Sequence, residues 1–554
     1  MTDSPTTGAR TPPDPADPLW NPRIERMPRD QMRALQLDRL KRQVAYNFEH
    51  SPFYREIFRA AGIAPGDVTG FDDFARVPLM TKDEHRDAQV RSLERFGDPY
   101  ALLACAPLEK IVRISSTSGT TGMPTLYTHT AHDVAVINEM NGRKYWRAGL
   151  RPGDVVVQAV SLSMFTGGLP VSQGIQHLGA CIVPVGVEGG TRRVLDFIEL
   201  TRPTAILATP SFGQYLIEEC PALTGKPVAE LGLTRFFCVG EPGGGIPEVR
   251  TALAEGFGAK VFDHTGGGHA FHGISMDEPP ERYSGMQFVS EDHCLLELVD
   301  PRTKAPVEQS DGAIGEMVFT SLDWEGTPFM RYALGDMIQV WDEPAGAATP
   351  GRLFKIIGRA DDMLIVKGAN VYPAAIQNVI AGLRPRVTGY FRIWLQEPGP
   401  LVRPPLKLRV EYGPDTADGD LTALEAELVT RCRDALRVRP VIEWLPPGAL
   451  PRESGKTKLI EIEGDAMELA PEHGQLGAPL KGATLIGSGI ISDTNGILEW
   501  NADAFDVDGN LQSEFINVKD PSIHHYRSRF RYARTRQLPV PICHLPCRRW
   551  PASW

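Results

Sequence analysis

Residues 115–130 read SSTSGTTGMPTLYTHT, a run of small hydroxyl side chains and glycines that no bulky residue interrupts before Met123. Gly119 and Gly122 can adopt positive φ and let an anion approach the main chain, so backbone N–H groups and hydroxyls of this loop can surround a phosphate. The segment lacks the G-x-x-x-x-G-K-[ST] spacing of nucleoside triphosphatases, and Thr125 follows the proline. It predicts a phosphate-binding loop of another type, with a solvated surface loop as the alternative.

The composition excludes several classes of protein. The chain has 554 residues, of which 42% are apolar and 23% charged, enough for two or more globular domains. A net charge of −11 argues against broad nucleic-acid binding. Eight cysteines without C-x-x-C pairs are typical of reduced thiols, and no stretch has the apolar length of a signal segment or membrane span. We therefore expect a cytoplasmic protein that binds neither nucleic acid nor membrane.

The order of apolar runs predicts an α/β fold. Residues 1–20 are rich in Pro, Thr and Asp and are predicted to be disordered, whereas apolar residues at helical spacing predict a helix over 32–44. Between about 130 and 265, helix-like stretches alternate with short β-branched runs, which indicates layers around parallel strands. These runs are 155–157, 181–185, 205–207 and 236–239. Sheets of this kind bind ligands at the carboxyl ends of their strands.

A smaller unit follows the polar break at residues 342–351. Residues 406–412 alternate strictly between apolar and charged side chains, the pattern of a strand with one face toward water. An apolar stripe over 421–436 predicts a helix, and 441–445 a closing strand. Residues 466–554 differ in character: the last part, 521–554, contains seven arginines and neither lysine nor acid. We expect this atypical tail to have no catalytic role.

Four separate blocks, in the same order, resemble the adenylate-forming (acyl-CoA synthetase, AMP-binding) superfamily. They are 115–125 (SSTSGTTGMPT), 331–336 (RYALGD), 358–373 (GRADDMLIVKGANVYP) and 450–456 (LPRESGK). Five further blocks are similar to the phenylacetate–CoA ligase group: 20–29 (WNPRIERMPR), 51–55 (SPFYR), 165–169 (FTGGL), 208–211 (ATPS) and 291–293 (EDH). The resemblance covers roughly residues 18–463.

The resemblance implies a large multi-layer α/β adenylating domain over 21–357 and a small mobile α+β lid domain over 358–465. Such enzymes join a carboxylate to the α-phosphate of ATP, giving an acyl-adenylate, and then transfer the acyl group to the thiol of CoA. ATP, Mg²⁺ and CoA are thus the expected cofactors, a small-molecule carboxylic acid the substrate, and a homodimer the expected assembly.

The resemblance also assigns roles to residues. The β- and γ-phosphates would lie on Thr117, Ser118, Gly119, Thr120, Thr121 and Gly122. The adenine would lie along Gly240, Glu241 and Pro242 and beside Asp263, His264 and Thr265. Asp336 would accept bonds from the ribose hydroxyls, and Arg359 would reach the ribose or phosphate. A plain loop, a turn aspartate and a surface ion pair are the alternatives.

Lys456 is the expected catalytic residue. A compact ammonium between the substrate carboxylate and the α-phosphate would offset the negative charge that accumulates in the adenylation transition state. Asp361 would be the hinge of the lid. Phe165, Gly167, Gly168 and Pro210 would line the acyl pocket, with core packing as the alternative.

The sequence departs from the superfamily pattern at residues 265–269. The pattern expects Tyr-Gly-x-Thr/Ser-Glu, and this chain has TGGGH, so the aromatic that would stack on adenine is absent unless His264 serves. His269 replaces the glutamate that would hold Mg²⁺, a cation that prefers oxygen ligands. His269, His272, His293 and Cys294 together form a candidate Zn²⁺ set.

Three functions stay open from the sequence. The first is an AMP-forming ligase that joins an aromatic or arylacetic acid to CoA. The second is an adenylating enzyme that passes the acyl group to a carrier protein or an amine. The third, motivated by His269, is an inactive relative that only binds a nucleotide.

Overall fold

The computed structural model describes residues 13–116, 124–164, 166–342, 349–360, 362–367, 369–397, 399–450 and 459–463, and three short strands beyond them. The chain forms two compact units, Met1–Ala470 and Pro471–Trp554. In the second unit the described residues form one antiparallel sheet of β23 (Thr484–Ile486), β24 (Asp503–Phe505) and β25 (Leu511–Ser513). Among the described helices, none combines the length and the apolar character that a membrane crossing requires.

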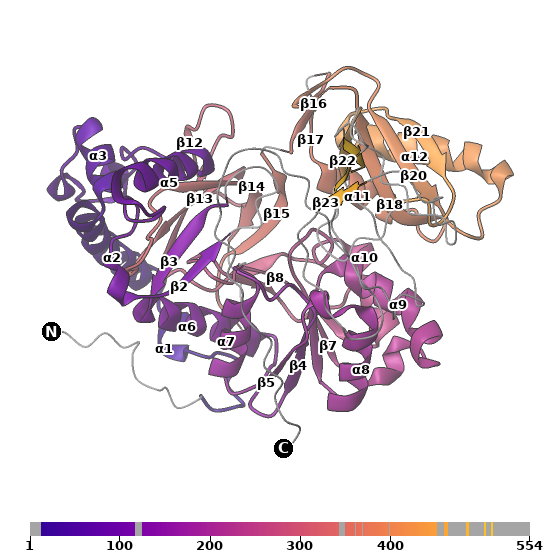
Figure 1. Cartoon of the computed structure of the whole chain (residues 1–554), viewed down its shortest axis with the longest axis horizontal. Helices are drawn as coiled ribbons and strands as arrows, with labels where there is room; N and C mark the ends of the chain where they lie inside the picture. The colour runs from indigo at the N-terminus through magenta and orange to yellow at the C-terminus, as the bar shows by residue number, and fades with distance from the viewer. Residues whose placement is uncertain are drawn as a thin grey trace. The chain divides into compact units, whose positions relative to one another are not determined.

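A mixed sheet of thirteen strands forms the centre of the first unit (Figure 1). In spatial order its strands are β12 (Pro306–Val307), β11 (Cys294–Val299), β13 (Ile314–Ser321), β14 (Tyr332–Trp341), β15 (Leu353–Arg359), β10 (Met286–Phe288), β9 (Gly273–Ser275), β8 (Lys260–Thr265), β7 (Arg235–Cys238), β6 (Ala205–Ala208), β4 (Val155–Gln158) and β5 (Cys181–Pro184), with β1 (Met80–Thr81) beside β14.

The parallel strands β4 to β8 are covered by helices on both faces (Figure 1). Alternate side chains explain this, because Val156 and Leu207 pack on one face and Val157 and Ile206 on the other. The first face carries α6 (Ala131–Arg147) and α7 (Leu169–His177). The second carries α8 (Thr191–Thr201), α9 (Pro210–Thr224) and α10 (Pro247–Phe257). The predicted α/β layering and its four parallel strands are confirmed.

The antiparallel part of the sheet packs against the N-terminal helices. These are α2 (Arg29–His50), α3 (Pro52–Ala60), α4 (Phe71–Phe74) and α5 (Lys82–Phe96), and the short helix α1 (Pro22–Glu25) precedes them in the chain. The helix predicted over 32–44 is confirmed as the middle of α2. The hairpin of β2 (Ile111–Ser116) and β3 (Leu126–Thr130) flanks the predicted phosphate loop, and Gln89 of α5 bonds Pro124 and Leu126 at its base.

The C-terminal part of the first unit has a hydrophobic cluster of its own. One sheet has the order β21 (Val441–Leu445), β20 (Lys407–Tyr412), β18 (Val387–Leu395) and β22 (Ile460–Ile462). A second consists of β17 (Ala369–Val371), β16 (Leu364–Val366) and β19 (Leu401–Val402). The helices are α11 (Pro373–Ala381) and α12 (Leu421–Leu436). The predicted strand, helix and closing strand are confirmed, whereas the domain boundary at 357/358 stays a prediction.

The polar face of β20 is open to water only at Lys407, so the prediction of a wet face is wrong for Arg409 and Glu411. Arg409 is 8% exposed and Glu411 is fully buried. Arg409 bonds Glu443 and Glu461, and Glu411 accepts hydrogen bonds from the backbone N–H groups of Gly448 and Leu450. Alternation in the sequence fixes which side chains share a face, and distant segments decide whether that face is covered.

The prediction of disorder is wrong for residues 13–20, because Leu19 and Trp20 are buried. The Trp20 indole donates to Glu139 of α6 at 2.9 Å, and the Asn21 amide donates to the other oxygen of the same carboxylate at 2.7 Å. Residues 1–12 lie outside the described residues. The N-terminal segment is thus bound to α6.

Helix α6 carries buried charges. Arg143 is 1% exposed and bonds Glu139 on its own helix and both carboxylate oxygens of Asp292, at 2.6 and 3.1 Å. Arg39 of α2 donates to the Asp292 carbonyl. Burial alone would raise the pKa of Asp292, but the Arg143 guanidinium holds it below its ordinary value. Two segments about 270 residues apart, 20–29 and 291–293, therefore meet on this helix.

We expect Arg143→Met to lower the free energy of unfolding by about 3–5 kcal/mol, because two buried carboxylates each lose a charged hydrogen-bond donor. Arg192→Met, which breaks the exposed pair with Asp196, should cost less than about 1 kcal/mol. Urea unfolding of both variants measures this, and equal small losses would contradict the role given to Arg143.

A second prediction concerns pH. The bond to Asp323 raises the pKa of His132 to about 9. Because this value lies above that of the unfolded chain, the stabilisation is complete below about pH 6.5 and is lost as the pH rises through 9. The free energy of unfolding of the wild type should exceed that of His132→Gln by about 2–3 kcal/mol at pH 6 and by much less at pH 9.5. A constant difference would refute the assignment.

Candidate active site

The carboxyl ends of β6, β7 and β8 lie side by side, because these strands are parallel and paired in register. The predicted residues Pro210, Gly240 to Pro242 and Thr265 lie at or just after these ends. The Ser211 N–H at the start of α9 donates to the Glu241 carboxylate at 2.7 Å. This edge is where a doubly wound sheet binds its ligand, and the structure brings the predicted segments together there.

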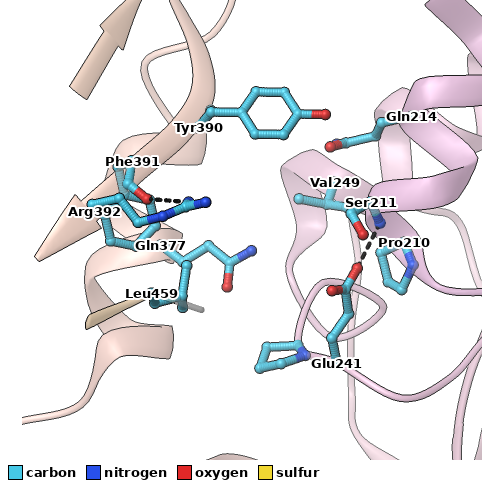
Figure 2. Close-up of a pocket in the computed structure, with 12 residues that line it drawn as sticks. Pro210, Ser211, Gln214, Glu241, Val249, Gln377, Tyr390, Phe391, Arg392 and Leu459 are labelled. Carbon is cyan, nitrogen blue, oxygen red and sulfur yellow. Dashed lines mark hydrogen bonds between the residues drawn. The ribbon is translucent and has the colours of Figure 1, made fainter. Parts of the chain in front are cut away.

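Figure 2 shows a pocket of about 60 Å³ beside this edge. Its wall includes Pro210, Ser211, Glu241 and Pro242, and residues of the C-terminal part complete it. These are Gln377, Gly389, Tyr390, Phe391, Arg392 and Leu459. The Glu241 carboxylate points to the N-terminal turn of α9, where its bond to Ser211 fixes it (Figure 2).

Asp263 on β8 is held by groups that the sequence did not indicate. The Tyr283 hydroxyl donates to its carboxylate at 2.7 Å, and burial raises the pKa of this group. Arg250 of α10 is fully buried, lies 5.3 Å from the Tyr283 ring and donates to the Gly244 carbonyl. Tyr283 and Arg250 stand alone in the sequence, with no motif around them that could have identified them.

Asp336 and Arg359 meet across β14 and β15. They are register partners, and the guanidinium donates to the Asp336 carboxylate at 3.1 Å. Arg359 also donates to the Leu334 carbonyl. The two residues that were expected to bind the ribose and the phosphate therefore lie together at one point, where β15 leads into the C-terminal part.

Gly167 and Gly168 precede α7, and Thr166 and Gly167 pack against the glycine turn of residues 266–268. A Cβ atom on Gly267 would lie 2.2 Å from the Thr166 carbonyl oxygen, and one on Gly268 would lie 3.2 Å from the Thr166 side chain. Gly266 has φ +83°, and a Cβ there would lie 2.2 Å from the Phe271 carbonyl. Only glycine permits this close approach of two main chains.

The structure does not present His264 as a stacking surface. The ring is 3% exposed and packs edge-on against Tyr145, with ring centroids 5.4 Å apart. Alternation along β8 turns His264 toward the helical layer of α6 and Asp263 toward the opposite side. The structure therefore gives no support to His264 as the ring that stacks on adenine, and its role beside the nucleotide stays a prediction.

The candidate zinc set is not supported either. His272 bonds the His269 carbonyl through Nε2, and His293 lies against Arg39 and Asp292. Cys294 is fully buried, and burial raises the pKa of its thiol. Within the described ranges, His, Cys, Asp and Glu side chains form no cluster of three or more that could hold a metal. The i, i+3 spacing of His269 and His272 does not direct both rings to one point.

The remaining predicted residues lie outside the described residues. They are Thr117, Ser118, Gly119, Thr120, Thr121, Gly122, Phe165, Asp361 and Lys456. Their roles stay predictions.

Comparison with protein families agrees with this geometry. Residues 69–322 match the model of the AMP-binding enzymes, and residues 368–461 match the AMP-binding enzyme C-terminal domain. Phenylacetate-coenzyme A ligase of Thermus thermophilus is 35% identical over 452 residues, which are 79% of this chain and 97% of that protein. The Escherichia coli protein of the same name is 30% identical over 435 residues, 78% of this chain and 95% of that protein.

Solved structures of a CoA ligase also match the fold of this chain. 2-Hydroxyisobutyryl-CoA ligase in the postadenylation state, in complex with R3-HIB-AMP, matches with a TM-score of 0.73 at 27% identity, over 82% of this chain and 94% of that one. The same enzyme with 2-HIB-AMP and CoA in the thioesterification state gives a TM-score of 0.58 at 28% identity, with the same coverage.

Fold, site and similarity define the class: the chain is an adenylate-forming enzyme of the AMP-binding family. Within this class it belongs to the phenylacetate–CoA ligase group. Its reaction is that of the group, in which ATP activates a carboxylic acid as an acyl-adenylate and CoA then takes the acyl group as a thioester.

We expect Tyr283→Phe to raise the KM for ATP about fivefold to tenfold and to leave the KM for CoA unchanged, because Asp263 loses a buried hydrogen-bond donor. Steady-state kinetics measures this. Tyr46→Phe, whose hydroxyl donates to the remote Glu325 carbonyl, is the matched control, and equal effects of both variants would contradict the prediction.

Proposed function

We propose that the chain is an AMP-forming ligase for an aromatic or arylacetic acid, with CoA as the acceptor. The observation that carries this proposal is the 30–35% identity to phenylacetate–CoA ligases over 95–97% of their length. Predicted nucleotide residues at the carboxyl edge of the sheet support it, since Glu241 follows β7 and Asp263 lies on the neighbouring strand β8.

The proposed chemistry has two steps. A carboxylate oxygen of the acid attacks the α-phosphorus of ATP, a P–O bond breaks and pyrophosphate leaves. The CoA thiolate then attacks the acyl carbon, and AMP leaves. Asp336 accepts hydrogen bonds from the ribose hydroxyls, and Lys456 offsets negative charge in the first transition state. Gly167 leaves room for the acyl group, since a Cβ atom there would meet nothing within 4 Å, and Gly168 is expected to line the same pocket.

In this proposal, Mg²⁺ binds together with ATP and not at a site of its own on the protein. A hard cation takes oxygen ligands, and the residue at the expected glutamate position is His269, whose Nε2 and Nδ1 are nitrogen donors. The side chains described there do not fit a resident magnesium site. Phosphate oxygens and water would supply its ligands, and none of the roles above depends on a protein-bound metal.

Carboxylate-dependent pyrophosphate–ATP exchange tests the proposal. A panel of benzoic, phenylacetic, phenylpropionic and aliphatic acids should give exchange that is strongest with one aryl acid, followed by thioester formation with free CoA. Exchange without transfer to CoA would favour a carrier protein or an amine as acceptor. No exchange with any acid would leave the inactive relative as the function, which His269 favours.

Lys456→Ala should lower exchange by at least about 100-fold, because the ammonium acts on charge that develops in the adenylation transition state. Thioester formation from supplied acyl-adenylate should fall by less than about tenfold, since that step no longer involves the α-phosphate as an electrophile. Lys458→Ala, two residues further on, is the control. Undiminished exchange in Lys456→Ala would remove the proposed catalytic residue.

A further inference from the structure

Two side chains of α6 donate hydrogen bonds to carbonyl groups of Thr265 and of the glycine turn, residues 266–268. The Lys144 amino group donates to the Gly266 carbonyl at 2.7 Å and lies 3.5 Å from the Thr265 carbonyl. The Asn141 amide donates to the Gly267 carbonyl at 3.1 Å. Asn141 and Lys144 are three residues apart, so they lie on one face of the helix. Three successive carbonyl groups of the turn are therefore directed toward α6.

This arrangement fixes the direction of the N–H groups as well. In a planar trans peptide the C=O of one residue and the N–H of the next point to opposite sides. With the carbonyls of residues 265, 266 and 267 bound to α6, the N–H groups of Gly266, Gly267 and Gly268 point away from the helix. Across the described part of the chain, none of these three N–H groups donates to an acceptor.

Burial of the Lys144 amino group costs free energy, because the amine loses its contact with water. The residue is fully buried, and burial lowers the pKa of its amine well below the ordinary value. The Tyr145 ring lies 4.9 Å from the amino group, and the Lys144 charge contributes to lowering the pKa values of the His264, His269 and His272 imidazoles, whereas no carboxylate contributes to the pKa of Lys144 itself. A hydrocarbon side chain would fill the same space without desolvating an amine. The carbonyl groups that it binds therefore explain its presence.

Resting on the proposed ligase function, we propose that Asn141 and Lys144 are positioning residues that orient the glycine turn for adenylation. The superfamily pattern expects a hydroxyl and a carboxylate at residues 268 and 269, and this chain has glycine and histidine. The groups of the turn that can bind a phosphate are therefore its main-chain N–H groups. The two α6 side chains hold that main chain in the orientation that a phosphate requires.

Three variants test this. Lys144→Met removes the donor and keeps an unbranched side chain, Lys144→Gln keeps an N–H donor without charge, and Gln43→Met removes a buried amide that donates to the remote Trp324 carbonyl. We expect Lys144→Met to lower pyrophosphate–ATP exchange at least tenfold and to weaken AMP binding, measured by titration calorimetry, about tenfold. The KM for CoA should stay within twofold, and Lys144→Gln should recover part of the loss.

Gln43→Met controls for stability, because it removes a buried donor far from the turn. Exchange and AMP affinity equal to wild type in Lys144→Met would overturn the proposal, and so would losses that Gln43→Met reproduces at a similar melting temperature. If the wild type binds AMP and exchanges with no acid, the proposed function fails, and AMP binding by the variants still decides the role of Lys144. If the wild type binds no AMP, both proposals fail.

Discussion

The buried ion pair between Arg143 and Asp292 is the constraint on which the arrangement around α6 depends. A guanidinium and a carboxylate removed from water are stable only if their geometry is nearly fixed, and here both carboxylate oxygens are bonded. Glu139, one turn earlier, shares the guanidinium and binds Trp20 and Asn21. The pair therefore sets the position of the helix relative to the chain segments on either side of it.

The position of α6 in turn sets the position of the glycine turn. Asn141 and Lys144 lie between and beside the charged residues of the same helix, and a helix is rigid over such a distance. A shift of α6 would move their donor groups and the carbonyls that they hold. The N-terminal segment, the 291–293 segment and the end of β8 are thus connected through one helix, although they are far apart in the sequence.

Much of the fold could be predicted from the sequence, because β-branched runs and helical stripes are local signals. Such a signal located β6 and β7, and with them Pro210 at the start of α9 and Glu241 in the loop after β7. The environment of Asp263 could not be predicted, since Tyr283 and Arg250 reach it from separate elements. The packing of His264 against Tyr145 could not be predicted either, because the sequence did not indicate which face of β8 is covered by α6.

The burial of the polar residues of α6 could not be predicted from the sequence either. Glu139, Asn141, Arg143 and Lys144 would read as a solvated face, and all four are buried in the structure. What makes their burial tolerable is a set of partners supplied by residues 20–21, 265–267 and 292, which no local pattern reveals. The resemblance to a family located the site, and the structure located the side chains that support it.

Fixing three successive glycines in one conformation costs conformational entropy, and the contacts with α6 can offset this cost. Each glycine lets two main chains approach closely, but it also adds conformational freedom that costs about 0.5–1 kcal/mol relative to alanine once it is fixed. Three such residues therefore cost about 1.5–3 kcal/mol. Hydrogen bonds from buried donors contribute about 1 kcal/mol each, and more when the donor is charged. The bonds from Asn141, Lys144 and His272 to the carbonyls of residues 265–269 are of the size needed to offset that cost. The glycine turn can thus pack closely against Thr166 and still keep one conformation. Without these hydrogen bonds, a glycine loop in the same place would be flexible.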